Sequence, residues 1–296
     1  MSQNVLIEFS EALKTRAEEA RGSVAAILGR RRPLSAIVWR DDLLVTSAQS
    51  LRRRERYEIA TSTGVAEATL AGEDPATNVA LLKLAAPLKA NTLAARAPVT
   101  GELALVYGAN RSGELRAKLG VVSAVGEAWH SSRGGLIDHR IGLDVDLRWP
   151  DEGGPAFGAD GSLIGMTTFG PFGRAIAIPT ATIERIVPLL EKDGRIARGW
   201  LGIALQPVAV PEAFRGEDGQ TSALMAMSVE ANGPAAKAGV LAGDIVLSVD
   251  GQTTERFRKI VSRLGPESVG KNVELRIVRG GAVQTLPLTV EARPAS

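Results

Sequence analysis

The sequence predicts a mainly β protein in which two all-β units of similar size are followed by a smaller module of strands and two helices. Three observations lead to this prediction. Short apolar runs, separated by turn residues or charged clusters, recur through the first part of the chain at intervals suited to antiparallel barrels or sandwiches. A helical pattern with a glycine at its end follows them. After that helix the spacing of strands and helices changes, which indicates a separate module.

Composition is typical of a globular protein and excludes several classes of protein. The 296 residues are 45% hydrophobic and 23% charged, and they suffice for two or three domains with buried cores. No apolar run approaches the roughly 20 residues of a membrane helix, so we expect no membrane span. The formal net charge of +2 implies no strong field for nucleic acid. The chain has no cysteine, which excludes disulfides and thiolate metal sites.

Two arginine clusters interrupt this charge balance, at Arg30 to Arg32 and at Arg52 to Arg56. Runs of this kind usually form solvated loop faces. We therefore expect no nucleic-acid partner from them.

Residues 1–22 are predicted to form an amphipathic helix. Leu6, Phe9, Leu13 and Ala17 recur at helical spacing among charged residues, which produces a single apolar stripe. This stripe must pack on the body of the protein or on another subunit. The same segment lacks a basic stretch followed by a continuous apolar run, so no secretory signal is visible. As written, the chain is expected in the cytoplasm, and in the periplasm if it is a processed form.

Residues 23–193 contain the two all-β units and a helix after them. The first set of apolar runs covers residues 24–28, 34–39, 43–46, 57–60, 65–70 and 79–84. The second set covers residues 103–107, 115–125, 141–147, 162–169 and 175–178. Thr180 is predicted to cap a helix that kinks at Pro188 and ends at Gly194. Its apolar face is expected to contain Ile183, Ile186, Val187 and Leu190.

Residues 199–292 are predicted to form the compact C-terminal module. Strands are expected at residues 200–205, 244–249, 273–278 and 283–290, the last two joined as a hairpin around Gly280 and Gly281. A short helix is expected over 234–239, where proline stands near the start and glycine at the end. Thr254 is predicted to cap a second helix that ends at Gly265. The apolar face of that helix contains Phe257, Ile260, Val261 and Leu264.

One loop has the form of a turn that presents a single residue. A strand with Leu143, Val145 and Leu147 on one face runs into the turn Pro-Asp-Glu-Gly-Gly-Pro, and a second apolar run follows from residue 162. Glu152 is the residue that this turn would present.

Three segments together resemble the HtrA/Deg family, whose members have a chymotrypsin-like double β-barrel and a C-terminal PDZ domain. Leu44 to Leu51 resembles the family's Ile-Leu-Thr-Asn-Ala-His-Val-Val, and Asp74 to Leu84 resembles Asp-Pro-x-Thr-Asp-Leu-Ala-Val-Leu-Lys-Ile. The Glu152 turn resembles Gly-Asn/Asp-Ser-Gly-Gly-Pro, and Gly173 to Pro179 stands in place of Gly-Ile-Gly-Phe-Ala-Ile-Pro. The resemblance implies a chymotrypsin-like double β-barrel over 23–193 and a PDZ domain over 199–292.

The three residues of the family's catalytic triad are replaced in this chain. Gln49 stands in place of the histidine, Asn78 in place of the aspartate and Glu152 in place of the serine. An amide cannot shuttle a proton near neutral pH, and a carboxylate would repel an incoming oxyanion. Pro150 stands in place of a glycine whose N–H helps to form the oxyanion hole, and proline has no N–H to donate. The resemblance and these losses together predict a pseudoprotease that is not an enzyme.

A metal site is the other chemical option, because several possible ligands lie close in sequence. They are Asp138, His139, Asp144, Asp146, Asp151 and Glu152. Asp144 and Asp146 share one strand face by the period of two. No recognised ligand spacing is present, however, so we expect no metal and no cofactor. His130 and His139 are expected to be surface residues rather than replacement bases.

The resemblance to PDZ domains includes a segment that stands in place of their carboxylate-binding loop. The residues that it implies for peptide binding are Arg198, Trp200, Leu201, Gly202 and Ile203. Successive N–H groups of such a loop hold a peptide's terminal carboxylate, and the following strand pairs with the peptide. Phe257, Ile260 and Leu264 are candidates for lining the pocket, with core packing as their alternative role.

These observations favour an HtrA-like pseudoprotease that acts as a peptide- or protein-binding scaffold or regulatory subunit. Its expected partners are protein C-termini or unfolded peptides. One alternative is an HtrA-type endopeptidase with residual or non-standard activity. The other is an assembly subunit that joins active HtrA proteases through the N-terminal helix. The resemblance also implies an oligomer, either a homotrimer or a hetero-oligomer with an active HtrA.

Overall fold

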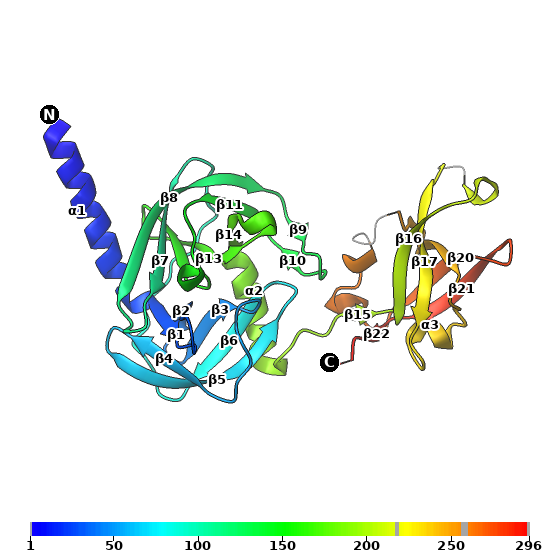
Figure 1. Ribbon diagram of the computed structural model, residues 1–296, viewed down its shortest axis with the longest axis horizontal. Coiled ribbons are helices and arrows are strands. Elements are labelled where there is room, and N and C mark those ends of the chain that lie inside the picture. Colours follow the sequence, from blue (N-terminus) through cyan, green and yellow to red (C-terminus); the bar gives the residue numbers. More distant parts are fainter. Residues whose placement is uncertain (1, 217–218, 256–259, 295–296) are drawn as a thin grey trace. The chain divides into compact units, whose positions relative to one another are not determined.

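The computed structural model describes residues 2–216, 219–255 and 260–294, and the chain separates into two compact units (Figure 1). The first unit comprises Met1–Trp129 with Leu136–Ile196, and the second comprises His130–Gly135 with Ala197–Ser296. Two closed six-stranded barrels form most of the first unit, and a six-stranded sheet forms most of the second. The finer division of the chain at residues 22, 193 and 199 stays a prediction.

The N-terminal helix α1 spans Ser2–Ala20 and continues into a short 3-10 helix, η1, at Arg21–Ser23. Its C-terminal half is anchored, because Leu13 and Ala17 pack against the main core cluster and Ala20 is buried in it. The apolar side chains of its N-terminal half are exposed, namely Val5, Leu6, Ile7 and Phe9. The predicted stripe is therefore covered only at its C-terminal end. Among the described residues, neither α1 nor any other helix is long and apolar enough to cross a membrane.

Six antiparallel strands close the first barrel in the order β1-β2-β3-β6-β5-β4. They are β1 (Val24–Ile27), β2 (Leu34–Arg40), β3 (Leu43–Ser47), β4 (Tyr57–Thr61), β5 (Gly64–Asp74) and β6 (Val79–Leu84). Successive side chains of β1 enter two different cores. Ala25 and Ile27 belong to a cluster within the first barrel, whereas Val24 and Ala26 belong to a cluster that includes residues of the second barrel. Burial on both faces explains why these strands read as continuous apolar runs.

Six further strands close the second barrel in the order β11-β14-β13-β12-β7-β8. They are β7 (Leu103–Ala109), β8 (Leu115–Gly126), β11 (Arg140–Asp144), β12 (Pro155–Gly158), β13 (Leu163–Phe169) and β14 (Ala175–Pro179). A separate two-stranded ladder pairs β9 (Trp129–His130) with β10 (Leu136–Ile137). Two 3-10 helices interrupt the loops of this barrel, η2 (Trp149–Asp151) and η3 (Pro171–Gly173).

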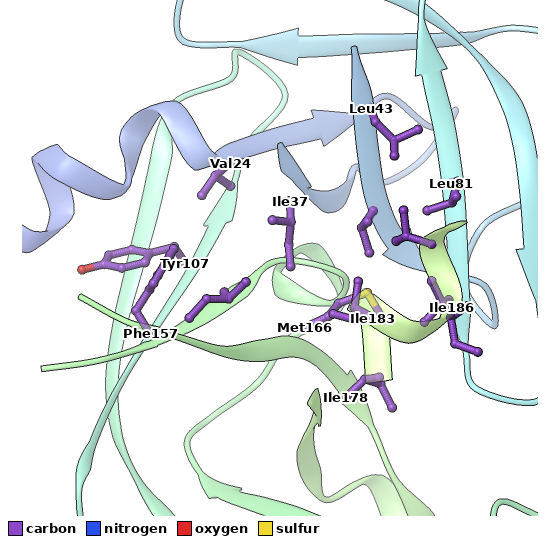
Figure 2. Close-up of a cluster of buried hydrophobic side chains, with 14 of the residues drawn as sticks. Val24, Ile37, Leu43, Leu81, Tyr107, Phe157, Met166, Ile178, Ile183 and Ile186 are labelled. Carbon is purple, nitrogen blue, oxygen red and sulfur yellow. The ribbon is translucent and has the colours of Figure 1, made fainter. Parts of the chain in front are cut away.

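The largest core cluster lies between the two barrels and the helix α2, Thr180–Asp193. Figure 2 shows side chains from all three sources in this cluster, including Ile37 and Leu43 of the first barrel, Met166 and Ile178 of the second, and Ile183 and Ile186 of α2. Each fully buried apolar side chain of this size contributes about 1.5–3 kcal/mol relative to an exposed one. The cluster therefore holds the two barrels together beneath the loops that carry the candidate site.

The predicted cap of α2 is wrong by one residue. Pro179 occupies the N-cap position, and Thr180 is the first helical residue. The hydroxyl of Thr180 donates to the carbonyl of Leu163 at 2.9 Å, so a neighbouring strand takes the hydroxyl that the prediction assigned to the cap. Gly194 ends the helix in the left-handed conformation, with a φ of 68° that favours glycine.

One sheet dominates the second unit, with the order β16-β17-β18-β20-β21 and with β19 paired to β18. Its strands are β16 (Ile203–Ala209), β17 (Ser222–Val229), β18 (Ile245–Val249), β19 (Gln252–Thr253), β20 (Asn272–Arg279) and β21 (Ala282–Thr289). A short ladder joins β15 (Gly199–Trp200) to β22 (Glu291–Ala292). The described helical turns are η4 (Glu212–Phe214), α3 (Pro234–Lys237) and η5 (Pro266–Ser268).

One prediction for this unit differs from the structure, and another falls partly on residues that the structure does not describe. The strand predicted over 200–205 is interrupted, because Gly202 has a φ of 73° and separates β15 from β16. A residue in that conformation cannot continue an extended strand. The helix predicted after Thr254 falls partly on residues 256–259, which lie outside the described residues. Thr254 itself is buried, and its hydroxyl donates to the carbonyl of Leu247 at 3.2 Å.

Candidate functional site

The three positions that align with the family's triad come together where the two barrels meet. Gln49 follows the end of β3, and Asn78 directly precedes β6, the strand that pairs with β3. Glu152 follows η2 in the second barrel. The Nε2 of Gln49 lies 2.7 Å from Oε1 of Glu152, and the backbone N–H of Gln49 donates to Oδ1 of Asn78 at 2.7 Å. The structure thus places all three side chains in one cluster.

Glu152 lies at the centre of this cluster and is fully buried, with 0% of its surface exposed. Its Oε1 accepts hydrogen bonds from the hydroxyls of Ser47 and Thr168, both at 2.9 Å, and from the amide of Gln49. Its Oε2 accepts a hydrogen bond from the hydroxyl of Ser50 at 2.6 Å. All of these donors are neutral, so hydrogen bonds rather than an ion pair offset the cost of burying the carboxylate. We call these five residues the carboxylate cage.

Sequence reasoning missed Ser47, Ser50 and Thr168. The two serines flank Gln49 in the sequence, and hydroxyl side chains are ordinary at the end of a strand and in the turn after it. Thr168 lies in β13, and its contact with Glu152 depends on the pairing of that strand. The only signal in the sequence was the concentration of hydroxyl groups around Gln49.

Asn78 orients Thr168 in the place where the family's aspartate would orient an imidazole. Its Nδ2 donates to the hydroxyl oxygen of Thr168 at 2.9 Å, and its Oδ1 accepts a hydrogen bond from the hydroxyl of Ser47 at 3.1 Å. Its backbone has a φ of 62°, a left-handed conformation that asparagine tolerates better than most residues. Asn78 therefore ties the first barrel to β13 through the cage.

In the loop that contains Pro150, the backbone N–H groups of residues 151 and 152 donate to carbonyls of the same turn. The N–H of Asp151 donates to the carbonyl of Arg148 at 2.8 Å, and the N–H of Glu152 donates to the carbonyl of Trp149 at 3.3 Å. Pro150 has no N–H. An oxyanion placed at this loop would therefore find no free N–H on residues 150–152.

Asp151 anchors the same loop through charge. Its side chain is buried, and its carboxylate lies 2.8 Å from Nζ of Lys118 and 3.3 Å from Nε of Arg116. The N–H of Arg148 also donates to Oδ2 of Asp151 at 3.1 Å. Two cations on β8 therefore help to hold the turn in the conformation just described.

The acidic residues considered as metal ligands are mostly paired with basic side chains. Asp138 lies 2.8 Å from Nη2 of Arg185 and accepts a hydrogen bond from Thr182 at 2.7 Å. Burial raises the pKa of Asp138, but the hydrogen bonds from Arg185 and Thr182 and the charge of Arg185 outweigh it and hold the pKa below its usual value. Asp146 pairs with Arg148 at 2.9 Å. Across the described residues, no group of three His, Asp or Glu side chains could hold a metal ion.

One contact in the cage could support catalysis, the hydrogen bond from the hydroxyl of Ser50 to the carboxylate of Glu152. Ser50 is half-buried, and a carboxylate that accepts a hydroxyl's hydrogen bond can act as a general base toward it. In the described chain, neither His130 nor His139 forms a hydrogen bond with the cage. The cage therefore lacks an imidazole but retains a hydroxyl beside a carboxylate.

In the second unit, the predicted carboxylate-binding loop forms the turn between β15 and β16. Ile203 is the first residue of β16. The carbonyls of Leu201 and Gly202 accept hydrogen bonds from the N–H groups of Ala235 and Glu230, at 2.9 and 2.8 Å. The N–H groups of Leu201 and Gly202 donate to no acceptor in the described part of the chain. Two adjacent backbone donors therefore remain available for an anion.

The other residues predicted to bind peptide occupy different environments. Arg198 directly precedes β15, and Trp200 is half-buried within it. Ile260 is buried and belongs to the core cluster of the unit, against which the half-buried Leu264 packs. Phe257 lies outside the described residues.

Both units match known domain families. Residues 34–166 match the trypsin-like peptidase domain, and residues 199–290 match the PDZ domain. The probable periplasmic serine endoprotease DegP-like of Brucella suis is 28% identical over 281 residues, which cover 90% of this chain and 54% of the relative. The protein of the same name from Halomonas elongata is 31% identical over 271 residues, covering 88% of this chain and 56% of the relative. This chain thus spans about half the length of these relatives.

Solved structures show the same fold. An HtrA-type protease, AlgW, with a decapeptide superposes with a TM-score of 0.72 at 23% identity, covering 96% of this chain and 99% of that one. A serine endoprotease from Yersinia pestis superposes with a TM-score of 0.72 at 23% identity, covering 95% and 98%. Together with the two closed six-stranded barrels, these similarities confirm the predicted fold class, a chymotrypsin-like double β-barrel followed by a PDZ domain.

The prediction that this chain is not an enzyme is contradicted by the comparisons. The relatives and the solved structures are named as serine endoproteases or proteases, and these names point to a protease. The prediction rested on replaced triad residues, but their replacement excludes one mechanism of hydrolysis rather than hydrolysis as such. The matches to both domains and the similarity to DegP-like relatives support the assignment of this chain to the HtrA/DegP family of trypsin-like peptidase-domain proteins with a PDZ domain.

Proposed function

We propose that this chain binds the C-terminal residues of polypeptides through its PDZ domain and serves as a scaffold or regulatory member of the HtrA family. The observation that supports this proposal is the pair of unused N–H groups on Leu201 and Gly202. A peptide's terminal carboxylate can accept hydrogen bonds from both, and an anion held by backbone donors forms strong, charge-assisted hydrogen bonds.

The strand after this loop determines the geometry of the bound peptide. Because β16 lies at one end of the sheet order, a peptide that continues from the carboxylate can pair with it as an additional strand. A short strand and one side-chain pocket bury little area, so we expect dissociation constants on the order of micromolar. Peptides that end in an apolar residue should bind best.

Peptide binding is tested with the full chain and fluorescent peptides that share one apolar C-terminal sequence. One set has a free carboxylate, and the matched set is amidated at the C-terminus. Fluorescence anisotropy should show saturable binding of the free peptides and no binding of the amidated ones, because amidation removes the charge that the N–H groups would hold. Equal binding of the two sets would contradict this mode of recognition.

A second candidate function is endopeptidase activity by a non-standard route. It is favoured by the names of the relatives and by the 2.6 Å contact between the hydroxyl of Ser50 and the carboxylate of Glu152. In this route the hydroxyl oxygen attacks the peptide carbonyl, its proton passes to the carboxylate, and the proton is then delivered to the leaving amine. Ester hydrolysis by water completes the turnover.

Casein cleavage by the wild type and two serine variants tests this second function. Ser50→Ala should abolish cleavage and labelling by a fluorophosphonate probe, whereas Ser112→Ala, which changes an exposed serine in the turn between β7 and β8, should leave both unchanged. Cleavage that survives in Ser50→Ala would exclude this serine as the nucleophile. An absence of cleavage in all three proteins would leave peptide binding as the only proposed function.

Compartment and assembly are further parts of the proposal. The relatives are named as probable periplasmic proteins, which supports the periplasm for this chain and makes the predicted cytoplasmic location the weaker alternative. Assembly into oligomers is supported by the uncovered apolar side chains of α1, among them Leu6 and Phe9. Light scattering should give a multiple of the monomer mass at micromolar concentration, and a monomer mass would exclude self-association.

A further inference from the structure

Three loops of the first unit contain exposed arginines and are in contact with one another. They are residues 28–33 between β1 and β2, residues 51–56 between β3 and β4, and residues 110–114 between β7 and β8. We use the name arginine patch for six residues of these loops, Arg30, Arg31, Arg32, Arg52, Arg54 and Arg111. The two arginine clusters of the sequence therefore belong to one surface, and a third loop adds to it.

Hydrogen bonds join the three loops directly. The N–H of Leu28 donates to the carbonyl of Glu58 at 2.8 Å, which places the first loop beside the start of β4. Nη1 of Arg54 donates to the carbonyl of Leu28 at 3.0 Å, and Nη2 of Arg111 donates to the carbonyl of Arg30 at 3.1 Å. The loops are thus in contact rather than merely on the same side of the barrel.

The charges of the arginine patch are not neutralised by ion pairs. All six residues are exposed, and none of them pairs with a carboxylate among the described residues. The two remaining arginines of the second loop do have acidic partners, Arg53 with Glu73 and Arg56 with Glu67. The acidic residues in these loops or within two positions of them in sequence are Glu55, Glu58 and Glu114. Six arginines against three acidic residues leave a local excess of positive charge on a chain whose net charge is only +2.

We propose that the arginine patch is a docking surface for a bilayer that contains anionic phospholipids. Guanidinium groups bind phosphate oxygens in pairs, and a bilayer surface presents many phosphates side by side. Basic residues near such a surface gain attraction to its negative potential. This role goes beyond peptide binding and does not depend on it, because the patch and the PDZ loop lie in different units.

The loops themselves favour contact with lipid headgroups over insertion into the bilayer. None of the large apolar side chains that are exposed in the described chain lies within residues 28–33, 51–56 or 110–114. Binding without an apolar wedge depends on charge alone, so it should disappear when salt screens the charges.

The same loops are poorly suited to nucleic acid. Binding of single strands usually depends on aromatic side chains that stack on bases, and no exposed aromatic residue lies in the three segments. Reading of a duplex usually depends on a helix or a two-stranded ribbon in the major groove, whereas these arginines lie on loops. The observations therefore favour a lipid surface.

Vesicle sedimentation with the full chain tests the proposal. Vesicles of phosphatidylcholine with about one-third phosphatidylglycerol should bind the wild type at low ionic strength, and pure phosphatidylcholine vesicles should not. Raising the salt concentration to about 0.5 M should release the protein. Duplex DNA is the competing ligand, and it should bind more weakly than the anionic vesicles.

The variant Arg30→Gln/Arg31→Gln/Arg32→Gln removes half of the patch and leaves Arg54 and Arg111, whose side chains join the loops, in place. Each arginine near an anionic surface is worth about a fivefold change in binding, so this variant should bind about a hundredfold more weakly. The matched control Arg140→Gln/Arg174→Gln/Arg276→Gln removes the same charge from exposed positions elsewhere and should bind like the wild type.

Three outcomes would overturn the proposal. The first is equal binding of wild type and patch variant to anionic vesicles, and the second is an equal loss in the control variant. The third is tighter binding to duplex DNA than to vesicles, which would make nucleic acid the partner. Circular dichroism of the patch variant shows whether it is folded, and normal peptide binding by that variant would confirm that its second unit is intact.

Discussion

The two candidate sites of this chain use their polar groups in opposite ways. In the carboxylate cage, both carboxylate oxygens of Glu152 accept hydrogen bonds from neighbouring side chains, and the N–H groups of residues 151 and 152 donate to carbonyls of the same turn. In the PDZ loop, the carbonyls of Leu201 and Gly202 are held by the protein while their N–H groups donate to no described acceptor. Both carboxylate oxygens of the cage are paired, whereas the PDZ loop retains two donors that are unpaired in the described chain.

This difference distinguishes polar groups that stabilise the fold from polar groups that can bind a ligand. A buried polar group that already has its partners stabilises the fold, and a ligand can reach it only by breaking those bonds. Leu201 and Gly202 are buried, so their backbone donors cost free energy without a partner and gain one when an anion binds. We therefore expect changes in the cage to affect stability and changes in the PDZ loop to affect binding.

The largest expected effect concerns the turn at Pro150. In a variant with Gln49→His, Asn78→Asp and Glu152→Ser, the addition of Pro150→Gly should raise the rate of hydrolysis by about 10²- to 10³-fold, because it supplies one oxyanion donor worth ~3–4 kcal/mol. Labelling by a fluorophosphonate probe and casein turnover measure the ratio of the two variants. Equal rates would mean that the turn keeps its N–H groups directed into the chain even with glycine.

The second prediction tests whether the cage is structural. Glu152→Ala should lower the free energy of unfolding by about 3 kcal/mol, because it leaves several buried donors without an acceptor and creates a cavity. Urea unfolding followed by circular dichroism measures the loss. The control Glu58→Ala changes an exposed glutamate of the same unit and should change stability by less than about 0.5 kcal/mol. A wild-type midpoint for Glu152→Ala would show that water can replace the carboxylate.

The third prediction compares the cage with a buried carboxylate that has a cation. Asp244 is buried in the second unit and lies 2.6 Å from Nη2 of Arg279. Burial raises the pKa of Asp244, but hydrogen bonds from Arg279 and the N–H of Leu241 and the charge of Arg279 outweigh it, so the pKa lies below its usual value. Arg279→Ala should therefore destabilise this unit at neutral pH, because it leaves the buried carboxylate of Asp244 without its cation.

The pH dependence of that loss follows from the direction of the shift. A depressed pKa in the folded state means that the carboxylate stabilises the fold above about pH 4 and that this contribution is lost as the pH falls through the folded pKa. The difference between wild type and Arg279→Ala should accordingly shrink below about pH 4 in thermal unfolding. Arg276→Ala, an exposed position on the same strand, should show no such difference at any pH. A pH-independent loss in Arg279→Ala would contradict the assignment to Asp244.

The smallest expected effect separates backbone strain from loss of binding. Gly202→Ala and Gly239→Ala each place a methyl group on a residue with positive φ, 73° and 81°, and each should cost about 1–2 kcal/mol of stability. Only Gly202→Ala should also weaken binding of a free-carboxylate peptide, by roughly tenfold, because strain there displaces the N–H groups of the loop. Equal affinities of the two variants in fluorescence anisotropy would argue against the open loop as the binding site.

Much of the fold and part of the candidate site could be predicted from the sequence. Apolar runs indicated strands that proved to be buried on both faces, as β1 shows, and glycine at position 194 ended α2 as expected. The resemblance of three segments to HtrA/Deg motifs was enough to identify Gln49, Asn78 and Glu152 as the positions of the family's triad. The sequence by itself therefore determined the order of the strands along the chain and the identities of the residues at the triad positions.

Only the tertiary structure decided what those residues do. Ser50 and Glu152 are 102 positions apart, and their hydrogen bond exists because two barrels pack on a shared core. The hydroxyl of Thr180 bonds to β13 instead of capping its own helix, and Ile260 joins a core that no local pattern distinguishes from a binding pocket. Periodicity reports which face of an element is apolar, but the partner on that face is chosen by packing between distant segments. For that reason the cage, the open loop and the arginine patch became visible only once those segments were brought together.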